Sequence, residues 1–377
     1  MIPVCTPSLL GNEKKYILDA LDTNWISSSG KYISAFEEAF ANYCGVKHGI
    51  AVTNGTNALH LALTSLGIGK EDEVIIPSFT MISSAFAICY TGAKPVFVDS
   101  EKETWNIDPL KIEEKITNKT KAIMVVHIYG HPCEMNKIRE IADKYNLKII
   151  EDAAEAHGAE YEGKLCGSLG DIACFSFFAN KIITTGEGGM VVTNSDELAE
   201  KCRYYKNVCF DLKSSRNYLH EDIGFNYRMS NLHAAIGLAQ TEKADEYVEM
   251  RRKNNFLYRK FLEGVKGITF QPEKEKIKNV YWMNSIIINP EEFGMTRDEL
   301  IKKLSEKGIG CRLFFNGMHN QPSLKKYGCN HEEDYPVSDW LAENGLYLPS
   351  GSGLTEEEIK EVCDTIKELQ KNIILTS

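Results

Sequence analysis

The sequence predicts an α/β fold with a mainly parallel sheet flanked by helices, followed by a smaller α+β domain. Up to about residue 245, short runs of β-branched residues alternate with helical stretches, and this alternation is typical of β–α–β units. Beyond that point, helical patterns surround few strand-like runs. We therefore predict a large domain over residues 1–245 and a small C-terminal domain over residues 246–377.

Short apolar runs between polar or glycine-containing turns mark the individual strands. In the large domain the clearest runs cover residues 49–52, 74–76, 95–98, 122–126 and 148–150. In the small domain we predict helices over residues 251–262, 296–306 and 356–369 and a strand over residues 280–288. The polar stretch between residues 206 and 222 has no clear period, so we expect a loop there.

The composition is typical of a soluble cytoplasmic enzyme. With 377 residues, of which 43% are hydrophobic and 25% charged, the chain can bury a sizeable core. The formal net charge of −10 gives no basic surface for nucleic acid. No apolar stretch approaches the length of a membrane span, and the N-terminus lacks the features of a signal peptide. The eleven cysteines form no CxxC pair, so we expect reduced cytoplasmic thiols.

Lys181 is the first candidate for chemistry. It follows the apolar run of residues 173–178 and precedes the glycine-rich segment 184–189. A lysine that enters a protein interior loses the hydration of its charged form, so its pKa falls and its amine becomes a nucleophile or a base. A lysine that binds an aldehyde cofactor covalently needs these properties. A surface lysine on a turn would give the same local pattern, so the residues alone leave both interpretations open.

Asp152 is the candidate for a second part of such a site. A pyridoxal phosphate site needs a carboxylate that keeps the ring nitrogen protonated and a cradle for the phosphate. The predicted strand 148–150 is followed directly by the acidic segment 151–155, and open α/β sheets bind ligands at the carboxyl ends of their strands. The alternative is an aspartate that caps the next segment.

The start of a predicted helix supplies a candidate phosphate cradle. The strand 49–52 breaks at residues 53–57 and leads into an amphipathic helix, whose free N–H groups and dipole attract anions. Gly55 permits close approach of the backbone, and the Thr56 hydroxyl can bind a phosphate oxygen. Ser176 could add another hydroxyl. An ordinary helix cap explains the same residues equally well.

A metal site is the other chemistry that the sequence suggests locally. His127, His131 and Cys133 offer two imidazoles and a thiol within seven residues. However, residues 125–127 resemble the end of a strand before a Gly-Pro turn, which would not converge the three ligands. We therefore predict no metal.

Ordered motifs along the chain resemble those of the DegT/StrS family of sugar-nucleotide aminotransferases, which are fold-type-I pyridoxal phosphate enzymes. In chain order they are NGTNALHLAL, IPSFT, KPVFVD, VHIYGHP, IIEDAAEAHGA, GSLGDIACFSF, NKIITTGEGG and GFNYRMS. The likeness is dense up to about residue 245 and looser beyond it. Residues 103–105, 129–132 and 177–185 carry a narrower likeness to the GDP-perosamine synthases, which aminate C4 of a 4-keto-6-deoxy sugar nucleotide.

The resemblance implies a role for each candidate of the cofactor site. Lys181 would carry the cofactor covalently and move the proton, and Asp152 would pair with the ring nitrogen. Gly55, Thr56 and Ser176 would bind the phosphate. The implied fold is that of a fold-type-I transferase with a seven-stranded sheet in its large domain.

Four further residues follow from the same resemblance. Glu155 stands where many relatives have glutamine near the phenolic oxygen of the cofactor, and a carboxylate there changes the charge beside the lysine. Met81 stands where many relatives stack an aromatic ring on the pyridine, and its thioether can cover a ring face. Asn226 and Arg228 match residues that reach the phosphate from the neighbouring subunit. The resemblance therefore implies a homodimer with shared active sites.

Candidates for substrate contact are spread along the chain. Ser29 lies in a turn that is near the sugar in relatives, and His157 follows the acidic segment. Arg216 and Tyr218 belong to the loop expected between residues 206 and 222 and could contact the nucleotide, although a solvated loop is an equal alternative. His319 is a candidate for the sugar or the diphosphate.

The implied reaction transfers the amino group of L-glutamate to the C4 ketone of a nucleotide-linked 4-keto-6-deoxy hexose, for surface polysaccharide or O-antigen biosynthesis. A dTDP- or UDP-linked sugar, or a 3-keto sugar, is an alternative substrate. Related sugar dehydratases carry histidine at the lysine position, so Lys181 argues against that chemistry. A non-catalytic regulator built on the same fold is the alternative of another class, and it predicts a lost lysine or ring-nitrogen acid.

Overall fold

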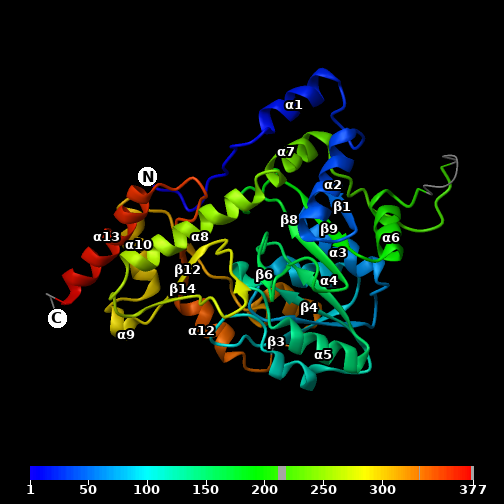
Figure 1. Cartoon of the computed structure of the whole chain (residues 1–377). Coiled ribbons are helices and arrows are strands. Elements are labelled where there is room, and N and C mark those ends of the chain that lie inside the picture. The colour runs from blue at the N-terminus through cyan, green and yellow to red at the C-terminus, as the bar shows by residue number, and fades with distance from the viewer. Residues whose placement is uncertain (211–217, 331, 375–377) are drawn as a thin grey trace.

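The computed structural model describes residues 1–210, 218–330 and 332–374 of the chain, with side chains up to residue 371. Its largest sheet holds seven strands in the order β1-β9-β8-β5-β4-β2-β3 (Figure 1). These strands are β1 (His48–Val52), β2 (Glu73–Pro77), β3 (Lys94–Val98), β4 (Thr120–Val126), β5 (Lys148–Asp152), β8 (Ile172–Ser176) and β9 (Gly189–Thr193). Strands β3, β2, β4, β5 and β8 run parallel, and β9 is antiparallel to both of its neighbours. The predicted α/β fold with a mainly parallel sheet is confirmed.

Helices cover both faces of this sheet because side chains of successive strand residues point to opposite faces. Ile50 and Ile150 belong to one core cluster, whereas Ala51 and Ile149 belong to clusters on the other face. The helices of this part are α2 (Lys31–Cys44), α3 (Gly55–Ser65), α4 (Ile82–Tyr90), α5 (Met135–Tyr145), α6 (Asp196–Lys206) and α7 (Asn231–Thr241). Helix α1 (Glu13–Asp22) lies beside α7 at the rim of the molecule (Figure 1).

Short elements complete this part of the chain. A three-stranded sheet joins β6 (Glu160–Tyr161) to β7 (Lys164–Leu165) and to β11 (Ile277–Lys278). The single-turn helices are η1 (Pro109–Lys111), η2 (Glu113–Lys115) and η3 (Ile128–Gly130).

The C-terminal part is built on a four-stranded antiparallel sheet, in the order β10-β12-β14-β13. Its strands are β10 (Ile268–Phe270), β12 (Asn284–Ile288), β13 (Arg312–Leu313) and β14 (Gly345–Leu348). Its helices are α8 (Ala244–Phe261), α9 (Pro290–Phe293), α10 (Arg297–Glu306), η4 (Met318–Asn320), α11 (Pro322–Tyr327), α12 (Pro336–Asn344) and α13 (Glu356–Ile374). The predicted helices at 296–306 and 356–369 are confirmed, the first with Thr296 and Glu299 as a capping box.

Two predicted boundaries were wrong. Helix α8 begins seven residues before residue 251 and links the two parts of the molecule (Figure 1). Tyr247 and Val248 pack in the core of the large part, whereas Leu257 and Tyr258 pack in the C-terminal core. The strand predicted over 280–288 begins only at residue 284, because Tyr281 has a positive φ of 47° that breaks the extended backbone.

The N-terminal residues and one segment of the C-terminal part cross the boundary between the parts. Ile2 pairs with Ile309 and packs in the C-terminal core. The segment after β13 returns to the large sheet, where the Ser338 N–H and hydroxyl both donate to Oδ1 of Asp99, at 2.9 and 2.8 Å. No helix among the described residues has the length and apolar character that a membrane span requires.

Candidate active site

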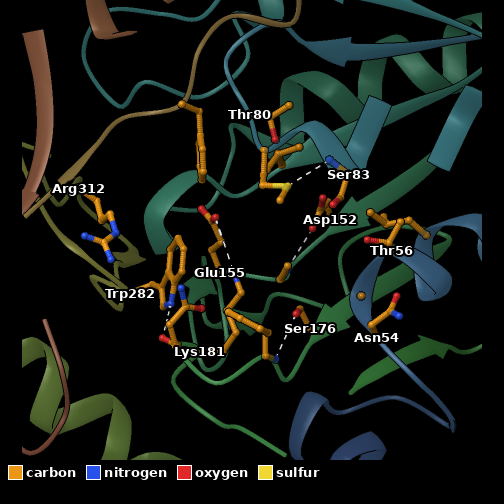
Figure 2. Close-up of a pocket in the computed structure, with 18 of the residues that line it drawn as sticks. Asn54, Thr56, Thr80, Ser83, Asp152, Glu155, Ser176, Lys181, Trp282 and Arg312 are labelled. Atoms are coloured by element: carbon orange, nitrogen blue, oxygen red, sulfur yellow. Dashed lines mark hydrogen bonds and ion pairs between the residues drawn. The ribbon is translucent and has the colours of Figure 1, made fainter. Parts of the chain in front are cut away.

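A cavity of about 530 Å³ opens at the carboxyl ends of the parallel strands. Its floor comes from the ends of β4, β5 and β8 and the start of α3, and residues of the C-terminal part close its other side (Figure 2). The lining residues include Asn54, Gly55, Thr56, Thr80, Met81, Ser83, Asp152, Glu155, Ser176, Asn180, Lys181, Glu187, Trp282, Arg312, Phe315 and Tyr347. The chain thus brings together seven residues that the sequence analysis proposed for one cofactor.

Lys181 projects into the centre of this cavity from the turn after β8. Only 11% of its side chain is exposed, and its Nζ lies 3.7 Å from Oε1 of Glu155. The same Nζ lies 3.7 Å from the centre of the Trp282 ring. Burial lowers the pKa of the Lys181 amine, although the charges of Glu155 and Asp152 oppose this shift. The lowered pKa favours the neutral amine, which is the reactive form.

Asp152 ends β5 at the cavity floor and is only 6% exposed. The Ser84 hydroxyl donates to its Oδ2 at 2.7 Å, and the Ala154 N–H donates to its Oδ1 at 3.2 Å. Burial raises the pKa of the Asp152 carboxyl, while these hydrogen bonds and the charge of Lys181 act against the increase. A cationic group placed against this carboxylate would offset the cost of its burial.

Glu155 is the buried acid that faces the Lys181 amine, and it is only 3% exposed. Its Oε2 accepts a 2.8 Å hydrogen bond from the backbone N–H of Tyr129, and Tyr129 adopts a left-handed conformation with φ of 55°. Burial raises the pKa of Glu155 to about 7, although Lys181 and the Tyr129 N–H favour its charged form. Glu155 therefore titrates close to neutral pH.

The start of α3 forms an anion cradle beside Ser176. Asn54 caps the helix by accepting from the Asn57 N–H at 2.9 Å, which leaves the first N–H groups of the helix, at Gly55 and Thr56, for a ligand. A Cβ on Gly55 would lie 2.8 Å from the Cβ of Ser176. Glycine therefore lets helix and strand approach closely enough to share one bound group.

These residues fit pyridoxal phosphate. The cradle of Gly55, Thr56 and Ser176 suits its phosphate, the buried Asp152 carboxylate suits its ring nitrogen, and the Lys181 amine suits its aldehyde. Met81 is half exposed at the cavity wall, where its Sδ accepts from the Ser83 N–H at 3.2 Å.

Three proposed residues lie away from this cavity. Ser29 and Arg228 line a second cavity of about 280 Å³ on the same chain. Arg228 Nε donates to Oδ1 of the exposed Asn226 at 3.0 Å, and its Nη1 donates to Oδ1 of Asn207 at 3.2 Å. Within one chain, these side chains do not meet the residues around Lys181.

The structure does not bring the two histidine candidates for substrate contact into the cavity. His319 is buried, its Nδ1 is 2.7 Å from the Ser78 hydroxyl, and its Nε2 is 3.0 Å from Oδ1 of Asp339. Since both ring nitrogens are occupied, the geometry favours a structural role. His157 is fully buried against Phe175 and Phe177, and burial lowers its pKa to about 3.

Tyr218 and Arg216 are the two candidates in the loop expected between residues 206 and 222. Tyr218 is 72% exposed and packs on Phe210 outside the cavity lining. Arg216 lies outside the described residues.

His127, one of the two histidines of the possible metal motif, has other partners. His127 Nε2 lies 3.0 Å from Oε2 of Glu151, and ligand atoms of His127, Glu151 and Cys166 lie within 4.8 Å of one another. Glu151 also accepts from the backbone N–H groups of residues 167, 169 and 170. Its oxygens therefore serve to hold the loop after β7.

Sequence reasoning missed the residues that close the cavity from the C-terminal part. Trp282, Arg312, Phe315 and Tyr347 come from distant segments that meet only in the folded chain. Ser84, the hydroxyl partner of Asp152, was also missed, although its position four residues after Thr80 on the first turns of α4 was a usable signal.

The chain is similar to known proteins over nearly its whole length. The model of the DegT/DnrJ/EryC1/StrS aminotransferase family matches residues 7–367. The chain is 47% identical over 368 residues to GDP-perosamine synthase of Escherichia coli O157:H7, covering 97% of this chain and 98% of that protein. It is also 47% identical over 369 residues to GDP-perosamine synthase of Caulobacter vibrioides, covering 98% of each. Among solved structures, DesI in the presence of its TDP-sugar product has a TM-score of 0.90 at 31% identity, covering 100% of this chain and 94% of that chain.

Proposed function

Since the chain belongs to the DegT/DnrJ/EryC1/StrS aminotransferase family, we propose that it uses pyridoxal phosphate to move the amino group of L-glutamate to the C4 ketone of a GDP-linked 4-keto-6-deoxy sugar. The observation that carries this proposal is the placement of the Lys181 amine between Glu155 and Trp282, in one cavity with Asp152 and the start of α3. The near full-length identity to two GDP-perosamine synthases supports the nucleotide and the carbon position.

Five residues of the cavity would each have a task in this reaction. Pyridoxal phosphate, when bound, supplies a ring that stabilises negative charge beside the transferred nitrogen. Asp152 would hold the proton on the ring nitrogen, because its buried carboxylate gains from a cationic partner. Lys181 would bind the aldehyde and then move a proton on the substrate, since its lowered pKa makes the neutral amine available. Gly55, Thr56 and Ser176 would hold the phosphate.

The remaining apolar and aromatic side of the cavity would take the substrate. Phe315, Tyr347 and Leu313 form this side, and the exposed Arg312 stands at its edge (Figure 2). Aromatic and aliphatic walls exclude water from the reacting carbon, which protects a nitrogen transfer from competing hydrolysis.

A homodimer with shared sites belongs to the proposal. Asn226 and Arg228 lie outside the cavity of their own chain, so they remain available to a neighbouring one. The segment around α1 supports an interface, because it exposes the large apolar side chains Leu9, Leu10, Leu18, Leu21, Trp25 and Ile26. All eleven cysteines are free thiols, which supports a reducing, cytoplasmic location.

A dTDP-linked sugar is the second candidate for the acceptor. The structural likeness to DesI, which was solved in the presence of its TDP-sugar product, favours it. Both candidates require the same chemistry at Lys181 and differ in the nucleotide.

The test is the visible absorbance spectrum of the purified chain with pyridoxal phosphate, before and after L-glutamate. We expect the band of the lysine-bound cofactor to disappear as the pyridoxamine form accumulates. A panel of GDP-, dTDP- and UDP-linked 4-keto sugars then identifies the acceptor by return of the band. A chain that forms no such band would contradict the cofactor and the role of Lys181. A band that ignores glutamate would contradict the proposed amino donor.

A further inference from the structure

Arg251 is a buried charge that the proposed reaction does not use. It lies in the middle of α8 and is 1% exposed. No carboxylate among the described residues is within 4 Å of its guanidinium, so it takes part in no ion pair there. Because a buried charge is costly unless it is paired or fully hydrogen-bonded, the contacts of Arg251 must compensate in another way.

The guanidinium of Arg251 instead donates hydrogen bonds to backbone carbonyls of separate segments. Its Nη1 donates to the carbonyl of Trp282 at 3.0 Å and to the carbonyl of Ser350. Its Nη2 donates to the carbonyl of Asn180 at 3.5 Å. Side chains take the other hydrogens, since Nε donates to the Ser352 hydroxyl at 2.9 Å and Nη2 contacts Sγ of Cys5 at 3.4 Å.

The Asn180 carbonyl connects Arg251 to the proposed reactive lysine, because Asn180 directly precedes Lys181. The indole N–H of Trp282 donates to this same carbonyl at 2.9 Å, while the ring of Trp282 lies 3.7 Å from Nζ of Lys181. Figure 2 shows Trp282 and Lys181 side by side. One tryptophan therefore fixes both the backbone before the lysine and the end of its side chain.

Trp282 is itself held on both of its sides. Its own N–H donates to the carbonyl of Tyr129 at 2.9 Å, and the two rings stack with centres 6.4 Å apart. Its carbonyl receives the hydrogen bond from Arg251. Within the turn itself, the Lys181 N–H donates to the carbonyl of Phe178 at 2.9 Å. The position of Lys181 thus depends on residues of the C-terminal part.

We propose that Arg251 and Trp282 form a brace, in which Arg251 fixes Trp282 and the Asn180 carbonyl and Trp282 fixes the amine of Lys181. Both are positioning residues for the covalent attachment of pyridoxal phosphate, so the inference rests on the proposed function. The brace also explains why an arginine is buried without an acid. The planar fork of a guanidinium spreads five N–H donors over separate carbonyls, whereas the ammonium of lysine offers three donors from one atom.

The test compares two forms of one cofactor on the full chain. Pyridoxal phosphate binds through its phosphate, its ring and Lys181, whereas pyridoxamine phosphate lacks the aldehyde and binds without the lysine. The ratio of their dissociation constants, from isothermal titration, therefore isolates the contribution of Lys181. For Trp282→Leu and Arg251→Lys we expect pyridoxal phosphate affinity to fall about tenfold relative to pyridoxamine phosphate affinity, because a misplaced amine forms the covalent bond less favourably.

A conservative variant and a matched control sharpen this test. Trp282→Phe keeps a ring beside Lys181 but removes the indole N–H, so its ratio should lie between those of the wild type and Trp282→Leu. Arg259→Lys is the control. Arg259 lies on the same helix and donates to the side chain of Asn255 and the carbonyl of Gln271, but does not contact Asn180 or Trp282. The ratio of dissociation constants in Arg259→Lys should equal that of the wild type. If Arg251→Lys does not fold, the Trp282 variants alone decide the test.

The outcomes separate the brace from the proposed function. Equal losses for both cofactor forms in the Trp282 variants would mean that the residue only supports the pocket, and would overturn the inference. An altered ratio in Arg259→Lys would overturn it as well, because any change in α8 would then suffice. A wild-type chain that forms no visible band with pyridoxal phosphate would instead overturn the proposed function.

Discussion

Lys181 and Glu155 occupy one buried space, so the charge of each influences the other. Burial lowers the pKa of the lysine and raises that of the glutamate, and each charge opposes the shift of its partner. Desolvation is the largest cause for both groups, and it shifts the lysine toward the neutral amine and the glutamate toward the neutral carboxyl. Burial of these two groups therefore carries a desolvation cost, which binding of a cofactor can reduce.

Replacing Lys181 by alanine should stop turnover without unfolding the chain. The variant loses the amine that we propose to bind the aldehyde and move the proton, and a positioned acid–base group contributes about 10²–10⁴-fold to rate. We expect the rate to fall by at least about this factor, while pyridoxamine phosphate still binds. Steady-state amination of the sugar nucleotide and a thermal melt check both statements. Turnover near that of the wild type would remove Lys181 from the mechanism.

Replacing Glu155 by glutamine should change how stability depends on pH. The folded pKa of about 7 lies above the ordinary value of 4.5, so the folded chain binds this proton more tightly than the unfolded chain does. The resulting stabilisation is complete below pH 4.5 and is lost as the pH rises through 7. The change from pH 4.5 to pH 8 amounts to about 3 kcal/mol.

Urea unfolding of the cofactor-free chain at pH 5 and pH 8 measures this effect. From pH 5 to pH 8, the free energy of unfolding of Glu155→Gln should rise by roughly 2–3 kcal/mol relative to that of the wild type. The reason is that the glutamine has no proton to lose in this range. Parallel stabilities of the two proteins at both pH values would show that Glu155 does not titrate in this range.

At the scale of elements, the contact between α3 and β8 sets the shape of the phosphate cradle. Gly55→Ala would place a Cβ 2.8 Å from the Cβ of Ser176, and the helix start would have to move away from the strand. We expect a loss of about 1–3 kcal/mol in stability and weaker binding of pyridoxal phosphate. A denaturant melt and a cofactor titration measure the two effects.

Gly69→Ala is the matched control for Gly55→Ala. An added Cβ at Gly69 would find its nearest atom, the carbonyl oxygen of Thr91, at 3.8 Å, which is an ordinary contact. Cofactor affinity should therefore stay at the wild-type value in this variant. Unchanged affinity in Gly55→Ala as well would mean that the close approach is not needed for the phosphate.

Local patterns were enough to predict the elements that carry the cofactor site. The runs before Gly55 and Asp152 are short, apolar and bounded by turns, and each forms the strand that was expected. Trp282 was not identified because the apolar run around it predicts a continuous strand, whereas Tyr281 breaks that strand with a left-handed backbone. His319 was assigned to the substrate because its partner Asp339, twenty residues away, gives no local signal.

At the scale of the whole molecule, the proposed dimer makes a complementation test possible. Lys181→Ala and Arg228→Ala chains should each be impaired alone. A mixed dimer would hold one site with both Lys181 and Arg228 intact, because in the proposed dimer the two residues of a site come from different chains. Co-expression with random pairing should therefore restore about a quarter of wild-type turnover, since half of the dimers are mixed and each has one of two sites.

The controls for complementation are the two variants mixed after separate purification, without exchange of subunits. That mixture should show only the sum of the two residual activities. If co-expression restores nothing beyond this sum, Arg228 acts within its own chain or has no part in the site.

The path of the chain between the two cores has a consequence for recombination between relatives. Ile2 packs in the C-terminal core, and Ser338 returns to Asp99 of the large sheet. A chimera that exchanges everything after residue 245 would therefore pair a foreign sheet with the old N-terminal residues and place a foreign segment against Asp99. Genetic exchange can preserve the packing of Ile2 only when the first few codons travel with the last third of the gene, so these two ends of the gene are expected to be inherited together.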